Sequence, residues 1–366
     1  MIDKYLSKKL IKGPWKLFPK PDKKYNYALV IPVYNELEYI DTLVSSINVQ
    51  DRTLLDKTAI VFVINNSDND KDAIIINNKH TIKNIVSYRQ KNFFIVDASS
   101  FGNEFKEKIA GVGTARKIGA DLILSFMNPN SILLYTDADV ILDNNYLSFI
   151  DSYFTKNNVE AAVVGFRHQH SNNNKINLIV SKYEDYLNET AKKIRETGSP
   201  YGYVSIGSCM VCRFDTYIAV GGMNKRRATE DFYFLNELSK YCNVQSICKV
   251  LVYPSSRSEN RVHLGTGFHI SRVLSGDLLS DLYFSEVAFV RLKELIRIVN
   301  NSFGIPYNQV DQQFMNLGAG YEFLGSNNIS IIWDKLQKDS KKSYQFINQF
   351  NRWFDGLKTI KFLKLF

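Results

Sequence analysis

Residues 131–140 constrain the fold of this chain more than any other segment. Their apolar run has the pattern of a buried strand and stops abruptly at Asp137 and Asp139. Because side chains alternate along an extended chain, both carboxylates can project to the same side. Such a pair suits a divalent cation, and the carboxyl end of a strand is where open α/β sheets usually bind ligands. A solvated acidic turn gives the same short pattern, so the neighbouring segments must decide between the two interpretations.

Polar residues also follow the other apolar runs of the first half of the chain. The runs at 27–33, 58–64 and 93–96 are each followed by asparagine, aspartate or glutamate, and helical patterns such as 37–47 separate them. Strands that alternate with helices predict an α/β fold with a mostly parallel sheet covered on both faces. Ligand-binding side chains are then expected along the carboxyl edge of that sheet.

The composition limits the class of protein and its partners. With 366 residues, 45% hydrophobic and 23% charged, the chain has the composition of a folded protein with a substantial core. The net charge of +9 favours nucleotides or anionic lipid as partners, and the absence of a basic block with interleaved aromatics argues against nucleic acid. No apolar run approaches roughly 18 residues and no signal peptide is visible, which predicts a cytoplasmic location.

Four motifs stand in chain order and together carry a resemblance: residues 32–36, residues 66–68, the Asp137/Asp139 pair and Glu230-Asp231. They resemble the family 2 glycosyltransferases, which have the GT-A fold, over roughly residues 27–267. We therefore expect a basic N-terminal arm at 1–24, a GT-A (Rossmann-like) domain at 25–267 and a helical C-terminal extension at 268–366. The last residues, 351–366, mix lysines with large apolar groups. An interfacial helix that meets the inner face of a membrane would show this pattern, but we favour a helix packed on the main domain.

The resemblance implies that Asp137 and Asp139 match the family's DxD motif, which holds Mn²⁺ or Mg²⁺ against the diphosphate of a nucleotide-sugar. The physical reason is independent of the family, because a hard cation neutralises the charge that develops on a departing nucleoside diphosphate. Asp139 is the stronger candidate for the direct ligand, whereas Asp137 can orient the ribose or a metal-bound water. His263 could complete the metal shell, or it could be an ordinary solvated histidine.

The pair Glu230-Asp231 is similar to the family's ED motif, in which the aspartate is the general base. That role implies that Asp231 removes a proton from the acceptor hydroxyl and that the product is inverted at the anomeric carbon. The alternative is structural, since acidic residues in a first helical turn often cap the helix and complement its dipole.

Further positions of this chain match the family's donor-binding segments. The second of these segments, residues 65–68, contains fewer aspartates here than the family's pattern does. That departure leaves the choice between uracil and guanine open, and turn chemistry explains the same asparagine and aspartate residues. The glycine-rich turn at 111–113 precedes an arginine that would face the donor, or it is a helix start that needs close packing. Gly265 and Gly267 are candidate hinges of a loop whose arginines would clamp the diphosphate. The complete set of expected donor-binding residues is Pro32, Tyr34, Glu36, Asn66, Asp68, Asp97, Arg116, Asp137, Arg257 and Arg261.

These features together predict a metal-dependent, inverting glycosyltransferase of the hexosyltransferase type. It would transfer a sugar from a UDP- or GDP-sugar to a hydroxyl of a glycan or lipid-linked acceptor, in bacterial surface polysaccharide biosynthesis. A sugar nucleotidyltransferase is the alternative enzyme, but the early glycine-rich basic loop of that class is not found near residues 32–36. A non-catalytic nucleotide-binding scaffold is the third possibility, and intact carboxylates at all three acidic positions argue against it.

Overall fold

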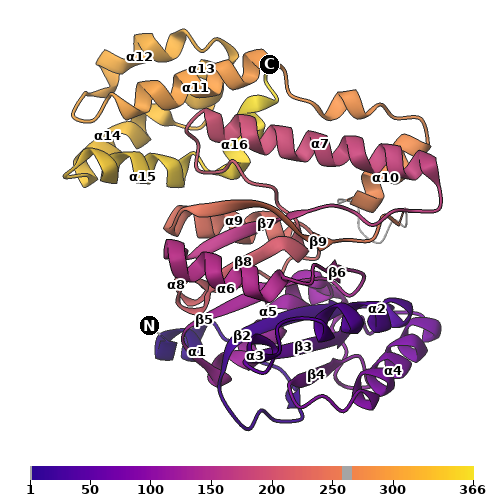
Figure 1. The fold of residues 1–366 in the computed structure, drawn as a ribbon. Helices are drawn as coiled ribbons and strands as arrows, with labels where there is room; N and C mark the ends of the chain where they lie inside the picture. Colours follow the sequence, from indigo (N-terminus) through magenta and orange to yellow (C-terminus); the bar gives the residue numbers. More distant parts are fainter. Residues whose placement is uncertain (1, 258–265) are drawn as a thin grey trace. The chain divides into compact units, whose positions relative to one another are not determined.

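The computed structural model describes residues 2–257 and 266–366. The chain divides into two compact units, one formed by residues 1–181 and 205–275 and the other by residues 182–204 and 276–366. Figure 1 shows a sheet with flanking helices in the first unit and a group of helices in the second. The elements that carry the predicted site all belong to the first unit.

In the described residues the first unit contains a nine-stranded mixed sheet with the order β1-β4-β3-β2-β5-β8-β7-β9-β6. The strands are β1 (Leu17–Phe18), β2 (Tyr25–Val33), β3 (Thr58–Asn65), β4 (Phe93–Ala98), β5 (Met127–Tyr135), β6 (Ile141–Leu142), β7 (Ala161–Phe166), β8 (Met210–Arg213) and β9 (Val244–Tyr253).

The core of this sheet is parallel, as the sequence predicts. Strands β4, β3, β2 and β5 run parallel to one another, and Val30 of β2 pairs with Val61 of β3 on one side and Tyr135 of β5 on the other. Strand β8 runs antiparallel between β5 and β7, while β7 and β9 are parallel. Every residue of β3 is buried, which explains its continuous apolar run. The α/β fold class is therefore confirmed.

Helices complete the first unit, and α5 packs on β2 and β3. Gly119 of α5 makes this close contact possible, because a Cβ at this position would lie 2.6 Å from a methyl group of Val30. Helices α2 and α4 pack against each other. The helices are α1 (Ile2–Lys8), α2 (Leu37–Asn48), α3 (Arg52–Leu55), α4 (Asp72–Ser87), α5 (Val112–Ile123), α6 (Tyr146–Asn157), α7 (Asn174–Glu196, whose later turns fall in the second unit), α8 (Phe214–Ala219), α9 (Glu230–Tyr241) and α10 (Thr266–Leu274).

The N-terminal residues are attached to the sheet unit at two points. Tyr5 of α1 is buried, and its hydroxyl donates a hydrogen bond of 2.7 Å to Asp121 of α5. The backbone N–H of Ile11 donates to the other oxygen of that carboxylate, and the indole N–H of Trp15 donates to the carbonyl of Asn103. Residues 2–15 therefore lie against the unit and are not a free surface arm.

The second unit is helical and has an apolar core rich in aromatic rings. Trp333 is fully buried, its ring centroid lies 5.4 Å from Phe314 and 5.0 Å from Phe346, and its indole N–H donates to the carbonyl of Ile305. Phe362 of the last helix is buried in the same core. Its helices are α11 (Glu286–Asn300), α12 (Tyr307–Met315), α13 (Ala319–Ser326), α14 (Ile329–Asp339), α15 (Ser343–Trp353) and α16 (Gly356–Leu363).

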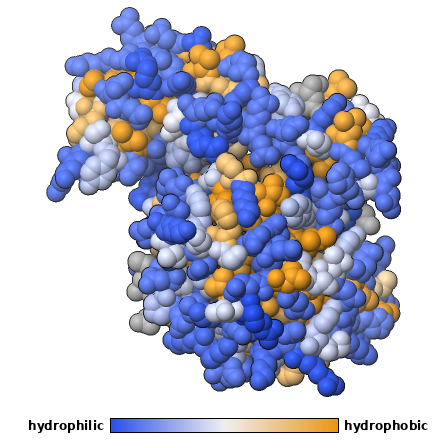
Figure 2. Space-filling view, in the orientation of Figure 1, coloured by the Kyte–Doolittle hydropathy of each residue, from blue (hydrophilic) through white to orange (hydrophobic). Residues whose placement is uncertain are grey.

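The sequence left two alternatives for the final helix, an interfacial helix and a helix packed on the main domain, and the structure shows a third arrangement. The helix packs into the core of the helical unit itself, through Phe362 and Leu363, because this unit buries enough aromatic surface to form a core of its own. Over the described residues, no helix has the length and apolar character needed to cross a bilayer. Hydrophilic residues cover most of the face drawn in Figure 2.

Candidate active site

The aspartate pair follows β5 directly, as the sequence predicts. The side chain of Asp137 is 35% exposed and that of Asp139 is 13% exposed, while Ala138 between them is buried. The backbone carbonyl of Asp139 accepts a hydrogen bond of 2.9 Å from the side-chain amide of Gln169, which also donates to the carbonyl of Tyr253 at the end of β9. The turn that carries both carboxylates is thus tied to the neighbouring part of the sheet.

Arg116 of α5 connects Asp137 to the acidic head of α9. Its side chain is only 2% exposed, and one terminal nitrogen donates to Asp137 at 2.5 Å while the other donates to Glu230. Burial acts to lower the pKa of Arg116, but the charges of Asp137 and Glu230 outweigh it and hold the pKa above its ordinary value. Arg116 therefore remains a cation inside the protein, where it links Asp137 to a segment more than ninety residues further along the chain.

Glycines make room for this arginine and for the segment beside it. A Cβ at Gly207 would lie 2.2 Å from a terminal nitrogen of Arg116, and a Cβ at Gly113 would lie 2.5 Å from the carbonyl oxygen of Arg226. A Cβ at Gly111 would lie 2.5 Å from the Cα of Arg227. Residues 224–227 lie directly against the glycines at the start of α5. These glycines therefore allow the close packing that was one of the two interpretations of residues 111–113.

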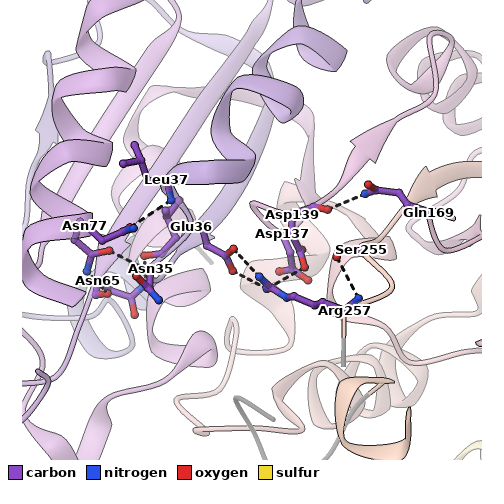
Figure 3. Close-up of polar contacts among 12 residues, drawn as sticks. Asn35, Glu36, Leu37, Asn65, Asn77, Asp137, Asp139, Gln169, Ser255 and Arg257 are labelled. Atoms are coloured by element: carbon purple, nitrogen blue, oxygen red, sulfur yellow. Dashed lines mark hydrogen bonds and ion pairs between the residues drawn. The ribbon is translucent and has the colours of Figure 1, made fainter. Parts of the chain in front are cut away.

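A second arginine, Arg257, connects Asp139 to the loop at residues 34–36, which follows β2 and is called the first loop (Figure 3). Its guanidinium forms a bidentate pair with Glu36 at 2.9 and 2.7 Å and reaches Asp139 at 2.9 Å. It also lies 5.0 Å from the ring centre of Tyr39. Burial acts to lower the pKa of Arg257, but Glu36 and Asp139 outweigh it and raise the pKa. Two residues predicted to contact the donor, Glu36 and Arg257, thus contact each other beside the aspartate pair.

The head of α9 places the proposed base beside Arg116. Glu230 is buried against that arginine, whereas Asp231 is partly exposed and accepts a hydrogen bond of 2.7 Å from the backbone N–H of Phe232. Burial raises the pKa of both carboxyl groups, and the charge of Arg116 opposes the shift. The N-cap residue of α9 is Thr229, and its side chain makes no capping hydrogen bond, so the contact from Phe232 is the one that Asp231 makes in the first turn of the described helix.

Asparagine side chains hold the first loop in place, and Figure 3 shows one of them, Asn77, against Leu37. The side-chain oxygen of Asn78 accepts from the backbone N–H of Asn35, and that of Asn77 accepts from the backbone N–H of Leu37. Asn78 also donates to the side chain of Asn66, which is 2% exposed. The predicted donor residue Asn66 is therefore buried and already hydrogen-bonded within this network.

The remaining donor candidates of the first loops lie at the same strand ends. Pro32 is buried in β2, beyond the last residue pair that β2 forms with β5. The Tyr34 hydroxyl donates to Asp70 at 2.9 Å, and Asp68 accepts from the backbone N–H of Glu107.

Asp97 accepts hydrogen bonds from the backbone of Ser99 and Ser100. Burial acts to raise the pKa of Asp97, but hydrogen bonds from Ser100 and Ser99 outweigh it and lower the pKa. Asp97 therefore shows the turn chemistry that was the alternative to nucleobase contact.

Part of the predicted loop lies outside the described residues. This applies to Arg261, His263 and Gly265, whereas Gly267 is described and belongs to the first turn of α10. Within residues 2–257 and 266–366, no group of three or more histidine, cysteine, aspartate or glutamate side chains is placed to hold a metal ion. The described chain therefore offers Asp137 and Asp139 as a pair of carboxylates and no larger ligand cluster.

Several supporting residues were not singled out from the sequence. Gln169 ties Asp139 to β9, Gly207 makes room for Arg116, and Asn77 and Asn78 fix the first loop. The adjacent pair Asn77-Asn78 inside an otherwise apolar helical pattern was an available signal, because asparagine disfavours helix interiors. Gly207 and Gln169 have no such local signal, since their partners are distant in the sequence.

No protein-family model matches the chain, and no curated protein matches it. Among solved structures, the chain is similar to Staphylococcus aureus TarS residues 1–349 at 13% identity, with 90% of each chain covered and a TM-score of 0.44. The complex of the same TarS fragment with UDP-GlcNAc is 16% identical, with 90% of this chain and 80% of that chain covered and a TM-score of 0.44. The mannosyltransferase PcManGT from Pyrobaculum calidifontis, in complex with GDP-Man and Mn²⁺, is 14% identical, with 96% and 94% covered and a TM-score of 0.43.

Proposed function

We propose that the chain is a family 2 glycosyltransferase with a GT-A domain at residues 25–267, and that it is metal-dependent and inverting. The observation that carries the proposal is a chain of contacts at the carboxyl end of β5. There, Arg116 bridges Asp137 of the aspartate pair to Glu230, which is adjacent to the candidate base Asp231. A metal-binding pair and a general base are thereby linked through one buried side chain, which is an arrangement suited to group transfer between a donor and an acceptor.

The aspartate pair fits a hard divalent cation. Mg²⁺ is usually held by one or two carboxylates together with substrate phosphates and water, so two partly exposed aspartates suffice without a larger cluster. In the proposal Asp139 and Asp137 hold Mn²⁺ or Mg²⁺, and His263 completes the shell. When bound, the cation would neutralise the negative charge of the departing nucleoside diphosphate.

Arg257 has the chemistry to contact the same diphosphate. Its planar guanidinium already forms a fork with the carboxylate of Glu36, and the same geometry matches phosphate oxygens. Glu36 is 6% exposed and orients the arginine toward Asp139. We assign Glu36 to positioning Arg257, and we retain Arg257 and Arg261 as the diphosphate clamp.

Asp231 is the proposed general base. It is partly exposed, so an acceptor hydroxyl can approach it, and its raised pKa makes it a stronger base than an ordinary aspartate. Glu230 is held by Arg116 and keeps the first turn of α9 in position. The proton leaves the acceptor oxygen for the Asp231 carboxylate as that oxygen attacks the anomeric carbon. The bond from that carbon to the diphosphate oxygen breaks, the nucleoside diphosphate leaves with the electron pair, and attack from the opposite face inverts the configuration.

The proposal assigns nucleoside recognition to the first two loops. Tyr34 and Asp68 are the polar side chains available there, together with Asp97, while the buried Pro32 and Asn66 shape the loops. The donor would be a UDP- or GDP-sugar, and the acceptor would be a hydroxyl on a glycan or lipid-linked molecule. We propose a role in bacterial surface glycan synthesis at the cytoplasmic side of the membrane.

The test is thermal stabilisation of the full chain by a panel of UDP, GDP and their sugars, each with and without Mn²⁺. A ligand that binds only the native state raises the melting temperature, and 100-fold excess over the dissociation constant stabilises by about 2.7 kcal/mol. We expect stabilisation by one nucleotide class, and we expect it to require Mn²⁺. Absence of stabilisation by every member of the panel would contradict the proposal and favour a scaffold.

Two variants separate the roles of the carboxylates. Asp139→Asn should lose both Mn²⁺-dependent nucleotide binding and transfer, whereas Asp231→Asn should keep nucleotide binding and lose transfer by about 10² to 10⁴-fold. The matched control is Asp56→Asn, because Asp56 is an exposed aspartate that pairs with the exposed Arg52 away from the site. Full activity of Asp231→Asn would exclude it as the base, and release of pyrophosphate from a nucleoside triphosphate would favour the nucleotidyltransferase instead.

A further inference from the structure

Three consecutive cations, Lys225, Arg226 and Arg227, stand immediately before the helix that carries Asp231, and we call them the basic turn. All three residues are exposed, and none forms an ion pair with another residue of the described chain. By contrast, the arginines at the centre of the site, Arg116 and Arg257, are each paired with two carboxylates. The basic turn therefore presents uncompensated positive charge next to the proposed base.

The basic turn is fixed to the head of α9 and to the start of α5. The side chain of Asn224 donates to the carbonyl of Glu230 at 2.9 Å, and the guanidinium of Arg226 lies 3.5 Å from the ring centre of Tyr233, two residues after Asp231. The backbone of Arg226 lies too close to Gly113, and that of Arg227 too close to Gly111, for either glycine to carry a Cβ. The backbone of the basic turn and the guanidinium of Arg226 are thus held at the head of the helix that carries Asp231.

Positive charge continues from the basic turn toward α1. Burial lowers the pKa of Lys117, Asp121 opposes this shift, and the nearby charges of Lys225 and Lys9 lower the pKa further. Lys9 is exposed and follows α1, which Tyr5 anchors on Asp121. Lys225 of the basic turn and Lys9 of the N-terminal segment thus both act on the buried Lys117.

We propose that the basic turn recognises an anionic acceptor, a glycan that carries phosphate or carboxylate groups beside the hydroxyl that Asp231 deprotonates. This inference rests on the proposed glycosyltransferase function and specifies the class of its acceptor. Guanidinium groups bind phosphate and carboxylate oxygens through parallel hydrogen bonds, and lysine adds a mobile point charge. A cationic surface beside the base also raises the local concentration of an anionic substrate.

An anionic chain fits this surface better than a lipid bilayer does. Peripheral membrane binding usually combines basic residues with large apolar side chains that enter the interface. Among the residues whose side chains are described, the exposed large hydrophobic side chains include none within residues 4–12 or 220–231. The basic turn and the end of α1 therefore offer charge without an apolar anchor.

The experiment measures binding of the full chain to inorganic polyphosphate, with neutral dextran as the uncharged comparison, as a function of salt concentration. The test variant is Lys225→Ala with Arg227→Ala, which leaves the Arg226 to Tyr233 contact intact. The matched control is Lys341→Ala with Lys342→Ala, which removes two exposed charges from the helical unit. Binding of UDP with Mn²⁺ is measured on each protein, so that loss of the acceptor surface is distinguished from loss of donor binding.

We expect the test variant to bind polyphosphate about fivefold more weakly than the unmodified chain, and the control to change by less than about twofold. The dependence of log affinity on log salt should become shallower by about one per lost phosphate contact. Melting temperature and UDP binding should match those of the control. Equal weakening by the test and control variants would overturn the inference, because binding would then reflect net charge alone.

A second arm uses phosphatidylcholine vesicles containing phosphatidylglycerol. If the basic turn instead binds membrane, the test variant will lose vesicle binding while its polyphosphate affinity stays unchanged, and this result overturns the anionic-acceptor inference. Retained polyphosphate recognition in a chain that binds no nucleotide would contradict the proposed function but leave the surface assignment standing. Transfer to an acidic oligosaccharide in preference to its neutral counterpart, lost in the test variant, would support both.

Discussion

Two arginines bridge the aspartate pair to glutamates from distant segments, yet their surroundings differ. Arg116 connects Asp137 to Glu230 and is 2% exposed, whereas Arg257 connects Asp139 to Glu36 and is 20% exposed. Arg116 projects from the middle of a helix that packs on the parallel sheet. Arg257 lies after the last strand, in a segment without regular secondary structure, immediately before residues outside the described chain.

This difference indicates different roles for two chemically similar contacts. A charge removed from water is held only if its partners stay in place, so the bridge through Arg116 must be part of the folded structure. A charge near the surface can exchange one carboxylate for a phosphate at little cost, so the bridge through Arg257 can open when a donor binds. The four predictions below test this distinction, from the largest expected effect to the smallest.

The largest effect is expected from Arg116→Met. Removing one partner of a buried ion pair leaves Glu230 without compensation, and the free energy of unfolding should fall by about 3–5 kcal/mol. Urea denaturation measures this loss. The double variant Arg116→Met with Glu230→Leu should recover part of it, since no buried charge then remains unpaired; a single variant as stable as the parent would show that Arg116 is not structural.

A smaller loss is expected from Gly207→Ala, which places a Cβ against the guanidinium of Arg116. The distance of 2.2 Å forces the arginine or the backbone to move, at a cost of about 1–3 kcal/mol in unfolding free energy. The control is Gly325→Ala in α13, where nothing lies within 4 Å of the new Cβ and a helical alanine should be neutral or stabilising. Equal effects of the two substitutions would show that the packing around Arg116 is not tight.

Arg257→Ala should change metal affinity more than stability. The unfolding free energy should fall by about 1–2 kcal/mol, because the buried Glu36 loses its hydrogen-bonded partner, the partly exposed Arg257. In the absence of nucleotide, the variant should bind Mn²⁺ several-fold more tightly, since a cation no longer competes for Asp139. Isothermal titration with Mn²⁺ measures this change, and weaker Mn²⁺ binding by the variant would contradict an exchangeable bridge.

Tyr39→Leu should have the smallest effect. The ring lies 5.0 Å from the Arg257 guanidinium, and its removal should cost about 0.5–1 kcal/mol of unfolding free energy. Leucine keeps an apolar side chain but removes both the ring and the hydroxyl, so the loss reports all the contacts of Tyr39 with Arg257 together. Tyr217→Leu is the comparison in the core, where a larger loss is expected because its hydroxyl donates to the buried Asp121. An equal loss at both positions would show that Tyr39 holds Arg257 as firmly as a core contact does.

The sequence determined the strands of the parallel core and the position of the aspartate pair. Apolar runs such as 58–64 specify buried strands because each residue must be excluded from water on both faces of the sheet. The position of Asp137 and Asp139 follows from the same pattern, since charged residues can stand only where the buried run ends. The start of α9 at Glu230-Asp231 was also visible, because acidic residues favour a first helical turn.

Only the tertiary structure decided which side chains the site brings together. Nothing in the local pattern around Arg116 indicates that its partners are Asp137 and Glu230, or that Gly207 must lack a side chain beside it. The pairing of Glu36 with Arg257 likewise joins residues more than two hundred positions apart. A local sequence pattern predicts which residues are buried, because burial depends on the polarity of each side chain. The partner of a charged side chain depends instead on which elements pack side by side, and that arrangement exists only once the sheet has formed.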